Sequence, residues 1–423
     1  MAAASDKKKV STPSHIHDDI ALSILSKLPL KSLTRFTCAK KSWSLLFQNP
    51  HFMNLFRSNF ISKHNEEEDN TNLILNYDSL CTFSGESFEN RVSLELPPPL
   101  HFQREGCPFI CSWCSASVNG ILCLSQGFLS PMTIVLWNPA TGEFKTVPCS
   151  HRPYENIEFN TQPYSFGYDR VRDDYKIIRM VNFHIFFEGA WVILPEKNSP
   201  FWEMDLDFDD DDDDFWEGVP INMYDPDYWE IYSLRSNSWR KLDGGDMPMP
   251  DSWDERCQVN LNEFCYWLSL DNDMGSFDFI NEIFFVTNLP SFDFSKETSL
   301  DGVSSIYDFN RRKLEKKLVV LNGSVAFICT VLMTAYIHIW VLGEIGVKES
   351  WTKLFVFGPL PGIIRPIAVG IKSVLFYIKE DMELACFDLS TQRIEEVWVN
   401  GEQLRLQIIT YKENLLSFGG MNN

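Results

Sequence analysis

The sequence predicts a multidomain chain in which a short α-helical module precedes a large all-β domain of the β-propeller type, with six blades expected. From residue 15 to 60, apolar residues recur at helical spacing. From residue 73 to 418, short runs of alternating apolar and polar residues lie between turn residues. These runs recur at an interval close to the period of about 50 residues that is typical of some propeller blades. Residues 1–14 are predicted to be disordered, and residues 61–72 to form a charged linker.

The first predicted helix begins with aspartates at positions 18 and 19. Negative charge in the first turn is favourable because it faces the positive end of the helix dipole. Ile20, Ile24 and Leu28 follow at four-residue intervals and therefore lie on one helix face. Pro29 ends the predicted helix, because its ring cannot continue the hydrogen-bond ladder.

Two further short helices are predicted, and both present large apolar side chains. The second presents Leu33 and Phe36, and the third presents Trp43, Leu46 and Phe47. A unit of about 45 residues is too small to bury all of this surface within itself. The sequence therefore predicts that another surface covers part of it, either from the rest of this chain or from another protein.

The segment Leu28-Pro29-Leu30-Lys31-Ser32-Leu33, followed by Arg35-Phe36 and Lys41-Ser42-Trp43, resembles an F-box. The sequence departs from that family's pattern at Ile16-His17, where Leu-Pro is usual, and at Lys40, where a second Cys is usual. The resemblance implies that the helices dock onto a Skp-type adaptor, which bridges to a cullin–RING scaffold in a ubiquitin ligase. An ordinary helical subdomain packed on its own chain is the alternative. The residues expected to contact the adaptor are Ile20, Ile24, Leu28, Pro29, Leu33, Phe36, Trp43 and Leu46.

The composition favours a globular chain and disfavours some functions. The 33 Phe and 13 Trp residues favour strands over helices. Two acidic tracts, residues 203–217 and 66–69, supply fourteen negative charges. The net charge of the whole chain is −21, and without these tracts it is −7. Nucleic-acid binding is disfavoured, since no basic stripe is present to neutralise phosphates. Eleven scattered Cys, and no secretory signal within residues 1–14, favour a reducing compartment, the cytoplasm or the nucleus.

A hairpin is predicted where Thr133–Trp137 and residues 143–147 flank the segment Asn138-Pro-Ala-Thr-Gly142. Pro139 presets the turn, and Gly142 can take the left-handed conformation that follows it. This local signal is the template for the repeats that follow.

The aromatic residue that closes the first strand of this hairpin has counterparts further along the chain. The interval from Phe292 to Trp340 is 48 residues, and that from Trp340 to Phe387 is 47. The interval from Trp137 to Tyr232 is 95 residues and contains the larger acidic tract, so we interpret it as one enlarged blade.

The repeats also resemble the F-box-associated, kelch-like domain of plant F-box proteins, over about residues 115–418. The resemblance implies a non-catalytic propeller that binds a protein substrate. The residues that carry it are Asn119-Gly120, Trp137-Asn138-Pro139, Gly167-Tyr168-Asp169, Asp174-Tyr175-Lys176 and Ser350-Trp351-Thr352-Lys353.

A stretch of 26 residues from Leu318 to Gly343 contains no Lys, Arg, Asp or Glu. Its length and lack of charge suit a transmembrane helix. Polar interruptions such as Asn322-Gly323 and the β-branched content favour a pair of strands buried within a blade instead. We therefore expect no membrane span, and we expect Val331 to lie in the turn between the two strands.

No motif for catalysis, cofactor binding or metal binding is found in the sequence. A Gly-rich phosphate loop, a Gly-x-Ser-x-Gly elbow and a His-Glu-x-x-His pattern are all missing. Cys111-Ser-Trp-Cys114 lacks the second Cys pair of a structural zinc site, so buried thiols are the better interpretation. The six consecutive carboxylates from Asp209 to Asp214 lack the turned spacing of a calcium loop.

The sequence therefore predicts the substrate-recognition subunit of an SCF-type (Skp–cullin–F-box) ubiquitin ligase. The alternatives are an S-locus F-box-like receptor that captures basic ribonucleases, a propeller scaffold without a ligase role, and a propeller enzyme such as a metal oxidase. The protein substrate is not identified by the sequence. The candidate contacts are the aromatic residues that flank the larger acidic tract, since aromatic side chains are enriched at interfaces, and a solvated spacer is the alternative. These residues are Phe201, Trp202, Phe215 and Trp216.

Overall fold

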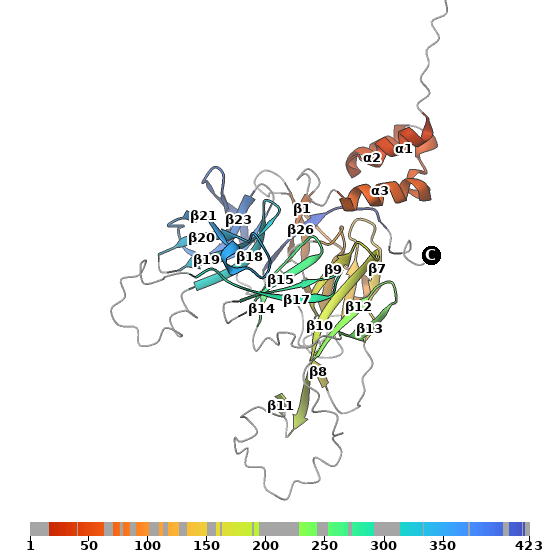
Figure 1. Cartoon of the computed structure of the whole chain (residues 1–423). Coiled ribbons are helices and arrows are strands. Elements are labelled where there is room, and N and C mark those ends of the chain that lie inside the picture. The colour runs from red at the N-terminus through yellow and green to blue at the C-terminus, as the bar shows by residue number, and fades with distance from the viewer. Residues whose placement is uncertain are drawn as a thin grey trace, which may run out of the picture. The chain divides into compact units, whose positions relative to one another are not determined.

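The computed structural model divides the chain into two compact units, Met1–Asn70 and Thr71–Asn423, which are described separately. The first unit is helical and the second is built from β-sheets (Figure 1). The structure describes residues 17–39, 41–62, 71–76, 79–84, 90–100, 110–112, 117–126, 133–149, 158–160, 163–187, 190–193, 228–242, 253–269, 273–291, 314–332, 334–370, 373–400, 406–416 and 418.

The helical unit contains three α-helices and two short 3₁₀ helices among its described residues. They are α1 (Asp18–Leu25), α2 (Leu30–Ala39), η1 (Lys41–Trp43), η2 (Leu46–Gln48) and α3 (Pro50–Ser62). The prediction for the third helix was wrong, because Trp43 and Leu46 lie in the 3₁₀ helices and the third α-helix follows them.

Asn49 explains why α3 begins where it does. Its side-chain Oδ1 accepts hydrogen bonds from the backbone N–H groups of His51 at 3.0 Å and Phe52 at 3.2 Å. These bonds satisfy two of the N–H groups that the start of a helix leaves without a partner. Pro50 suits the first helical position because no N–H is needed there. The Asn-Pro pair is thus the start signal that the motif-based prediction overlooked.

The core of the helical unit contains buried apolar side chains from α1, α2, η2 and α3. Asn59 of α3 donates a hydrogen bond from Nδ2 to Oγ of Ser26, at 2.7 Å, and so ties α3 to the end of α1. The phenyl rings of Phe52 and Phe56 stack with centroids 6.0 Å apart. The buried apolar residues are Ala21, Leu25, Leu30, Leu33, Leu46, Phe52 and Phe56.

The described residues of the second unit form six sheets, and each sheet includes four neighbouring antiparallel strands, which is the arrangement of a six-bladed β-propeller (Figure 1). The predicted propeller and its six blades are therefore confirmed. Blade 1 contains β26 (Gln407–Lys412), β1 (Thr71–Asn76), β2 (Leu80–Ser84) and β3 (Asn90–Ser93), and blade 2 contains β4 (Ile110–Ser112), β5 (Leu122–Gln126), β6 (Thr133–Trp137) and β7 (Phe144–Thr146).

The remaining blades follow in chain order. Blade 3 contains β9 (Pro163–Asp169), β10 (Asp174–Phe187), β12 (Tyr228–Ser233) and β13 (Ser238–Lys241), and β8 (Glu158–Asn160) and β11 (Ala190–Ile193) pair with the second half of β10. Blade 4 contains β14 (Trp253–Leu261), β15 (Phe264–Ser269), β16 (Asp273–Asp278) and β17 (Ile283–Asn288). Blade 5 contains β18 (Leu314–Leu321), β19 (Ser324–Val331), β20 (Tyr336–Val341) and β21 (Thr352–Phe357), and blade 6 contains β22 (Ile363–Val369), β23 (Val374–Lys379), β24 (Glu383–Asp388) and β25 (Ile394–Asn400).

Blade 1 closes the ring, because its strands come from the two ends of the domain. β26 pairs antiparallel with β1 along the whole length of both strands, from Thr71 opposite Lys412 to Asn76 opposite Gln407. The side chains of Asn76 and Gln407 are also joined, by an Nδ2–H···Oε1 hydrogen bond of 2.9 Å. The propeller therefore cannot open between its first and last strands without breaking this ladder.

The predicted repeat marks the third strand of most blades. Trp137, Tyr232, Trp340 and Phe387 lie in β6, β12, β20 and β24, each the third strand of its sheet. Phe292 comes after the last strand of blade 4 and lies outside the described residues. In that blade the third strand is β16, which ends Phe277-Asp278, so the repeat is less regular than the sequence suggested.

The enlarged blade of the sequence prediction is blade 3, which has six strands. Its strand β10 is 14 residues long, and its second half pairs with β8 and β11 beyond the four-stranded core of the blade. The acidic tract of residues 203–217 falls between β11 and β12 and lies outside the described residues.

The uncharged stretch from Leu318 to Gly343 forms strands, as predicted. It covers the end of β18, all of β19 and all of β20. Asn322 and Gly323 have φ values of +50° and +74°, and two left-handed residues are typical of the tight turn that joins neighbouring strands. Within the part of the chain that the structure describes, no helix is long and apolar enough to cross a membrane.

The prediction that Val331 lies in a turn was wrong. Val331 is the last residue of β19, and its side chain is 3% exposed. We therefore expect Val331→Lys to lower the free energy of unfolding by about 1–3 kcal/mol, because the lysine must leave water or bend its stem out of the blade. The control is Leu354→Lys in β21 of the same blade, where the side chain is 43% exposed. Equal urea midpoints for both variants would contradict the buried position of Val331.

Candidate docking face and interblade polar cluster

Helix α1 presents two different apolar faces. Ala21 and Leu25 are 8% and 3% exposed and pack into the helical unit. Ile20 and Ile24 are 57% and 52% exposed. Each pair is separated by four residues, so each pair lies along one side of the helix. The helix therefore keeps one apolar side for the core and presents the other to solvent.

The residues predicted to contact an adaptor separate into two groups. Leu33 and Leu46 are 0% and 2% exposed, so they hold the helical unit together and are not available to a partner. The other six are accessible in part or in full. Ile20, Ile24, Pro29 and Phe36 are exposed, and Leu28 and Trp43 are half-buried.

Sequence reasoning missed Leu45, which is 59% exposed. It lies between η1 and η2, where neighbouring side chains point in different directions, and Leu46 next to it is buried. The rings of Phe36 and Trp43 meet edge to face, with centroids 5.9 Å apart, and so join α2 to η1. We use the term docking face for the exposed apolar residues Ile20, Ile24, Phe36 and Leu45.

The candidate substrate contacts cannot be placed in the same way. Trp202, Phe215 and Trp216 lie outside the described residues, as does Cys114 of the Cys-x-x-Cys pair. Within the residues that the structure does describe, no three His, Cys, Asp or Glu side chains are grouped as a metal ion would require.

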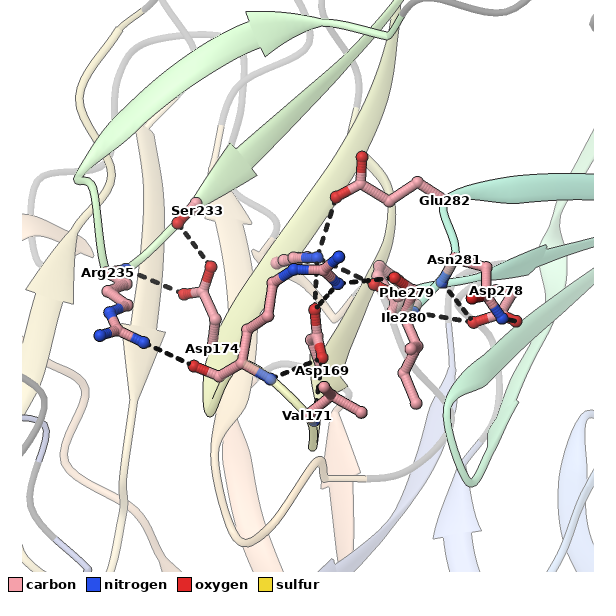
Figure 2. Close-up of polar contacts among 12 residues, drawn as sticks. Asp169, Val171, Asp174, Ser233, Arg235, Asp278, Phe279, Ile280, Asn281 and Glu282 are labelled. Carbon is pink, nitrogen blue, oxygen red and sulfur yellow. Dashed lines mark hydrogen bonds and ion pairs between the residues drawn. The ribbon is translucent and has the colours of Figure 1, made fainter.

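A cluster of charged residues joins blade 3 to blade 4 (Figure 2). At its centre is Lys176 of β10, whose side chain is 4% exposed. Its Nζ donates to Oδ2 of Asp169 at 2.7 Å, to Oε1 of Glu282 at 2.9 Å and to the backbone oxygen of Phe279 at 2.9 Å. Asp169 belongs to blade 3, and the other two residues belong to the turn between β16 and β17 of blade 4. The buried ammonium group thus bonds to residues of both blades.

The turn of blade 4 is shaped to meet this lysine. Oδ1 of Asp278 accepts hydrogen bonds from the backbone N–H groups of Ile280 at 2.7 Å and Asn281 at 3.1 Å. An aspartate that binds the backbone two residues ahead is a common way to fix a turn. The turn directs the backbone oxygens of Phe279 and Ile280 toward blade 3, where Lys176 and Arg172 donate to them.

Asp169 is buried, and its surroundings favour its charged form. Burial alone raises the pKa of this carboxyl group, but the hydrogen bonds from Lys176 and Arg172 outweigh that effect and hold the pKa below its usual value. The same holds for Glu282, where burial raises the pKa and the bonds from Arg240 and Lys176 lower it. Stability from a lowered carboxyl pKa is present above the unfolded value and is lost as the pH falls through the folded value. The cluster therefore stabilises the domain at neutral pH.

Comparison with known proteins identifies this architecture. The family described as the F-box associated beta propeller domain matches residues 115–416, well over half of the chain. The chain belongs to this family. The match thus covers the propeller from β5 in the second blade to the closing strand β26.

Relatives of this F-box associated protein include plant F-box proteins. One from Arabidopsis thaliana is 24% identical over 382 residues, which cover 86% of this chain and 77% of the relative. A second is 24% identical over 397 residues and covers 88% and 82%. The Arabidopsis F-box protein CPR1 is 23% identical over 402 residues, with coverage of 89% and 82%. Each of these alignments therefore covers most of this chain.

One part of the F-box associated motif, Trp137-Asn138-Pro139, supports the closure of the ring. Nδ2 of Asn138 donates to the backbone oxygens of Leu416 at 3.1 Å and Asn414 at 3.3 Å. Its Oδ1 accepts from the N–H of Ala140 at 3.0 Å, which shapes the β6–β7 turn. Asn138 is fully buried, so the motif fastens the chain that follows β26 onto blade 2.

Two glycines of the F-box associated motif permit close packing. Gly120 has φ of +76°, and a Cβ there would lie 2.6 Å from the backbone oxygen of Lys412 in the closing strand. A Cβ on Gly167 would overlap the buried ring of Phe279 in blade 4. The family resemblance noted in the sequence thus corresponds, at these positions, to contacts between blades.

Proposed function

We propose that this protein is the substrate-recognition subunit of an SCF-type ubiquitin ligase. The observation that carries the proposal is the docking face, a set of large apolar side chains exposed on a helical unit that precedes an F-box associated propeller. Exposed apolar patches on soluble proteins commonly mark protein–protein contacts. The resemblance of residues 28–43 to an F-box assigns a Skp-type adaptor to that face, with a cullin–RING scaffold beyond it.

In this proposal the protein carries out no bond chemistry. It holds a protein substrate close to a ubiquitin-loaded enzyme that the rest of the complex supplies. Because the protein binds the adaptor and the substrate at the same time, it raises the effective concentration of the substrate near that enzyme. The rate of ubiquitin transfer then increases without a new catalytic group. We place the protein in the cytoplasm or the nucleus, and the buried cysteines Cys123, Cys265, Cys329 and Cys386 suit that reducing environment.

The test is co-purification of the full-length chain with a Skp-type adaptor. We expect the two proteins to elute from a sizing column as one complex, and we expect the complex to bind a cullin. The control is an unrelated propeller protein expressed with the same adaptor. Separate elution of the chain and several Skp-type adaptors, with the helical content of the chain intact, would contradict the proposed function.

A further inference from the structure

Four arginines surround the outer side of the cluster that joins blades 3 and 4. The side chains of Arg170, Arg172 and Arg240 are 65%, 56% and 54% exposed, and Arg235 is also exposed. The carboxyl groups that accompany them are less exposed, and Glu263, the partner of Arg170, is 24% exposed. Asp169 and Asp174 are buried, and the side chain of Glu282 is 19% exposed. Arg170, Arg172 and Arg240 are therefore more exposed than the carboxylates with which they pair.

Hydrogen bonds connect the turns that carry two of these arginines, Arg172 and Arg235. Nη1 of Arg172 donates to Oδ2 of Asp169 at 2.8 Å and to the backbone oxygen of Ile280 at 2.7 Å. Nη1 of Arg235 donates to the backbone oxygen of Arg172 at 2.9 Å. The backbone N–H of Arg235 binds Oδ1 of Asp174 at 2.9 Å, as Figure 2 shows. The turn that carries Arg172 and the turn that carries Arg235 are therefore fixed against each other.

Arg240 and Arg170 each pair with a carboxylate of blade 4. Arg240 is paired with Glu282, which also accepts a bond from Lys176. Arg170 is paired with Glu263 of blade 4 at 3.4 Å. A guanidinium group has five N–H donors, so one or two inward bonds leave others for a partner. The arginines are held in place by contacts within the protein and still present donors to solvent.

Two exposed apolar residues are next to these charged residues in the sequence. Val171, between Arg170 and Arg172, is 70% exposed. Ile283, next to Glu282, is 50% exposed. We use the term arginine face for Arg170, Val171, Arg172, Arg235, Arg240 and Ile283. The arginine face contains four positively charged side chains and two exposed apolar side chains. It is positively charged although the chain as a whole carries a net charge of −21.

We propose that the arginine face binds an acidic peptide segment of a partner protein. Guanidinium groups match carboxylates in shape and charge, and charge complementarity across an interface selects among partners. The exposed Val171 and Ile283 favour a segment in which Asp and Glu flank an apolar residue. The acidic segment would belong to a ubiquitination substrate, and this part of the proposal rests on the receptor function proposed above. The binding of an acidic segment by the arginine face does not depend on that function.

The test measures the binding of a labelled peptide to the full-length chain by fluorescence anisotropy. The peptide contains Glu and Asp around a central Leu, and a second peptide has Gln and Asn in their place. We expect the acidic peptide to bind and the Gln and Asn peptide not to bind. The affinity for the acidic peptide should fall as the salt concentration is raised, because exposed charges are screened beyond about 10 Å at 0.1 M salt. Equal binding of the two peptides would overturn the proposal.

Variants locate the binding. Arg170→Gln with Arg235→Gln should weaken the affinity for the acidic peptide about tenfold, since each exposed charge pair contributes modestly. Arg172 is left intact in this variant because it contacts the buried Asp169. The matched control removes two exposed positive charges from blades 5 and 6, by Lys348→Gln with Arg393→Gln. The proposal is wrong if both double variants weaken binding equally, or if neither does, whatever the result of the adaptor test.

Discussion

Replacing Lys176 by methionine should lower the free energy of unfolding of the propeller by about 3 kcal/mol, because breaking a buried ion pair leaves a charge that water cannot solvate. The buried ammonium group of Lys176 binds the carboxylates of Asp169 and Glu282 and a backbone oxygen in blade 4. Methionine has a similar length and fills the same space without any of these bonds. The urea midpoint, followed by tryptophan fluorescence, measures the change.

Lys379 provides a matched control in blade 6. Its Nζ lies 2.9, 3.2 and 3.5 Å from carboxylate oxygens of Asp381, Glu383 and Glu396. These carboxylates are 55%, 49% and 62% exposed, so water replaces the lost ammonium group. We expect Lys379→Met to change the free energy of unfolding by no more than about 0.5 kcal/mol. If both replacements lower the free energy of unfolding equally, the burial of Lys176 is not the cause of the loss of stability.

The pH dependence should separate the loss of charge from a loss of packing. Without Lys176, the pKa of Asp169 and that of Glu282 should rise, and both groups then take up protons more readily in the folded state. The difference in stability between the wild type and Lys176→Met should therefore be largest near neutral pH. It should shrink as the pH falls toward about 4, where carboxyl groups are protonated in the unfolded chain. A difference that stays constant with pH would indicate a packing defect.

The blade pattern could be predicted from the sequence because it depends on neighbours in the chain. Trp137, Asn138 and Gly142 form a hairpin from their own conformational preferences, and the same pattern reappears at Phe387. The pattern failed at Phe292, where an aromatic residue followed by Asp imitates the end of a third strand. The structure assigns that position to Phe277. A regular interval in the sequence indicates repeated strands. Insertions between the strands change that interval, so the interval alone does not identify the equivalent residue in every blade.

The polar cluster could not be predicted in the same way. Asp169 and Lys176 are close in the sequence, but Glu282 is more than a hundred residues away and meets them only because blades 3 and 4 are neighbours. The docking face was predicted in part. The spacing of Ile20 and Ile24 identified one helix face, but spacing alone does not show whether that face lies inside or outside the unit. Leu33 has the same apolar character and lies in the core.

The exposure of Ile20 and Ile24 leads to the second large effect. Ile20→Ala with Ile24→Ala should weaken binding to a Skp-type adaptor about 100-fold, since buried anchors of an interface contribute about 2 kcal/mol each and such effects are not strictly additive. The fold should be nearly unchanged, because side chains that are 57% and 52% exposed contribute little to the packing of the helical unit. Adaptor affinity is measured by calorimetry and helical content by circular dichroism.

A core variant separates docking from folding. Leu33 is 0% exposed, and Leu33→Ala should destabilise the helical unit by about 2–5 kcal/mol through the cavity that it leaves. This variant should lose adaptor binding together with helical signal, whereas the Ile20 and Ile24 variant should lose binding alone. Full binding by the double alanine variant would show that the adaptor does not use this face of α1. A loss of helical signal in that variant would show that the two isoleucines hold the unit together, as Leu33 does.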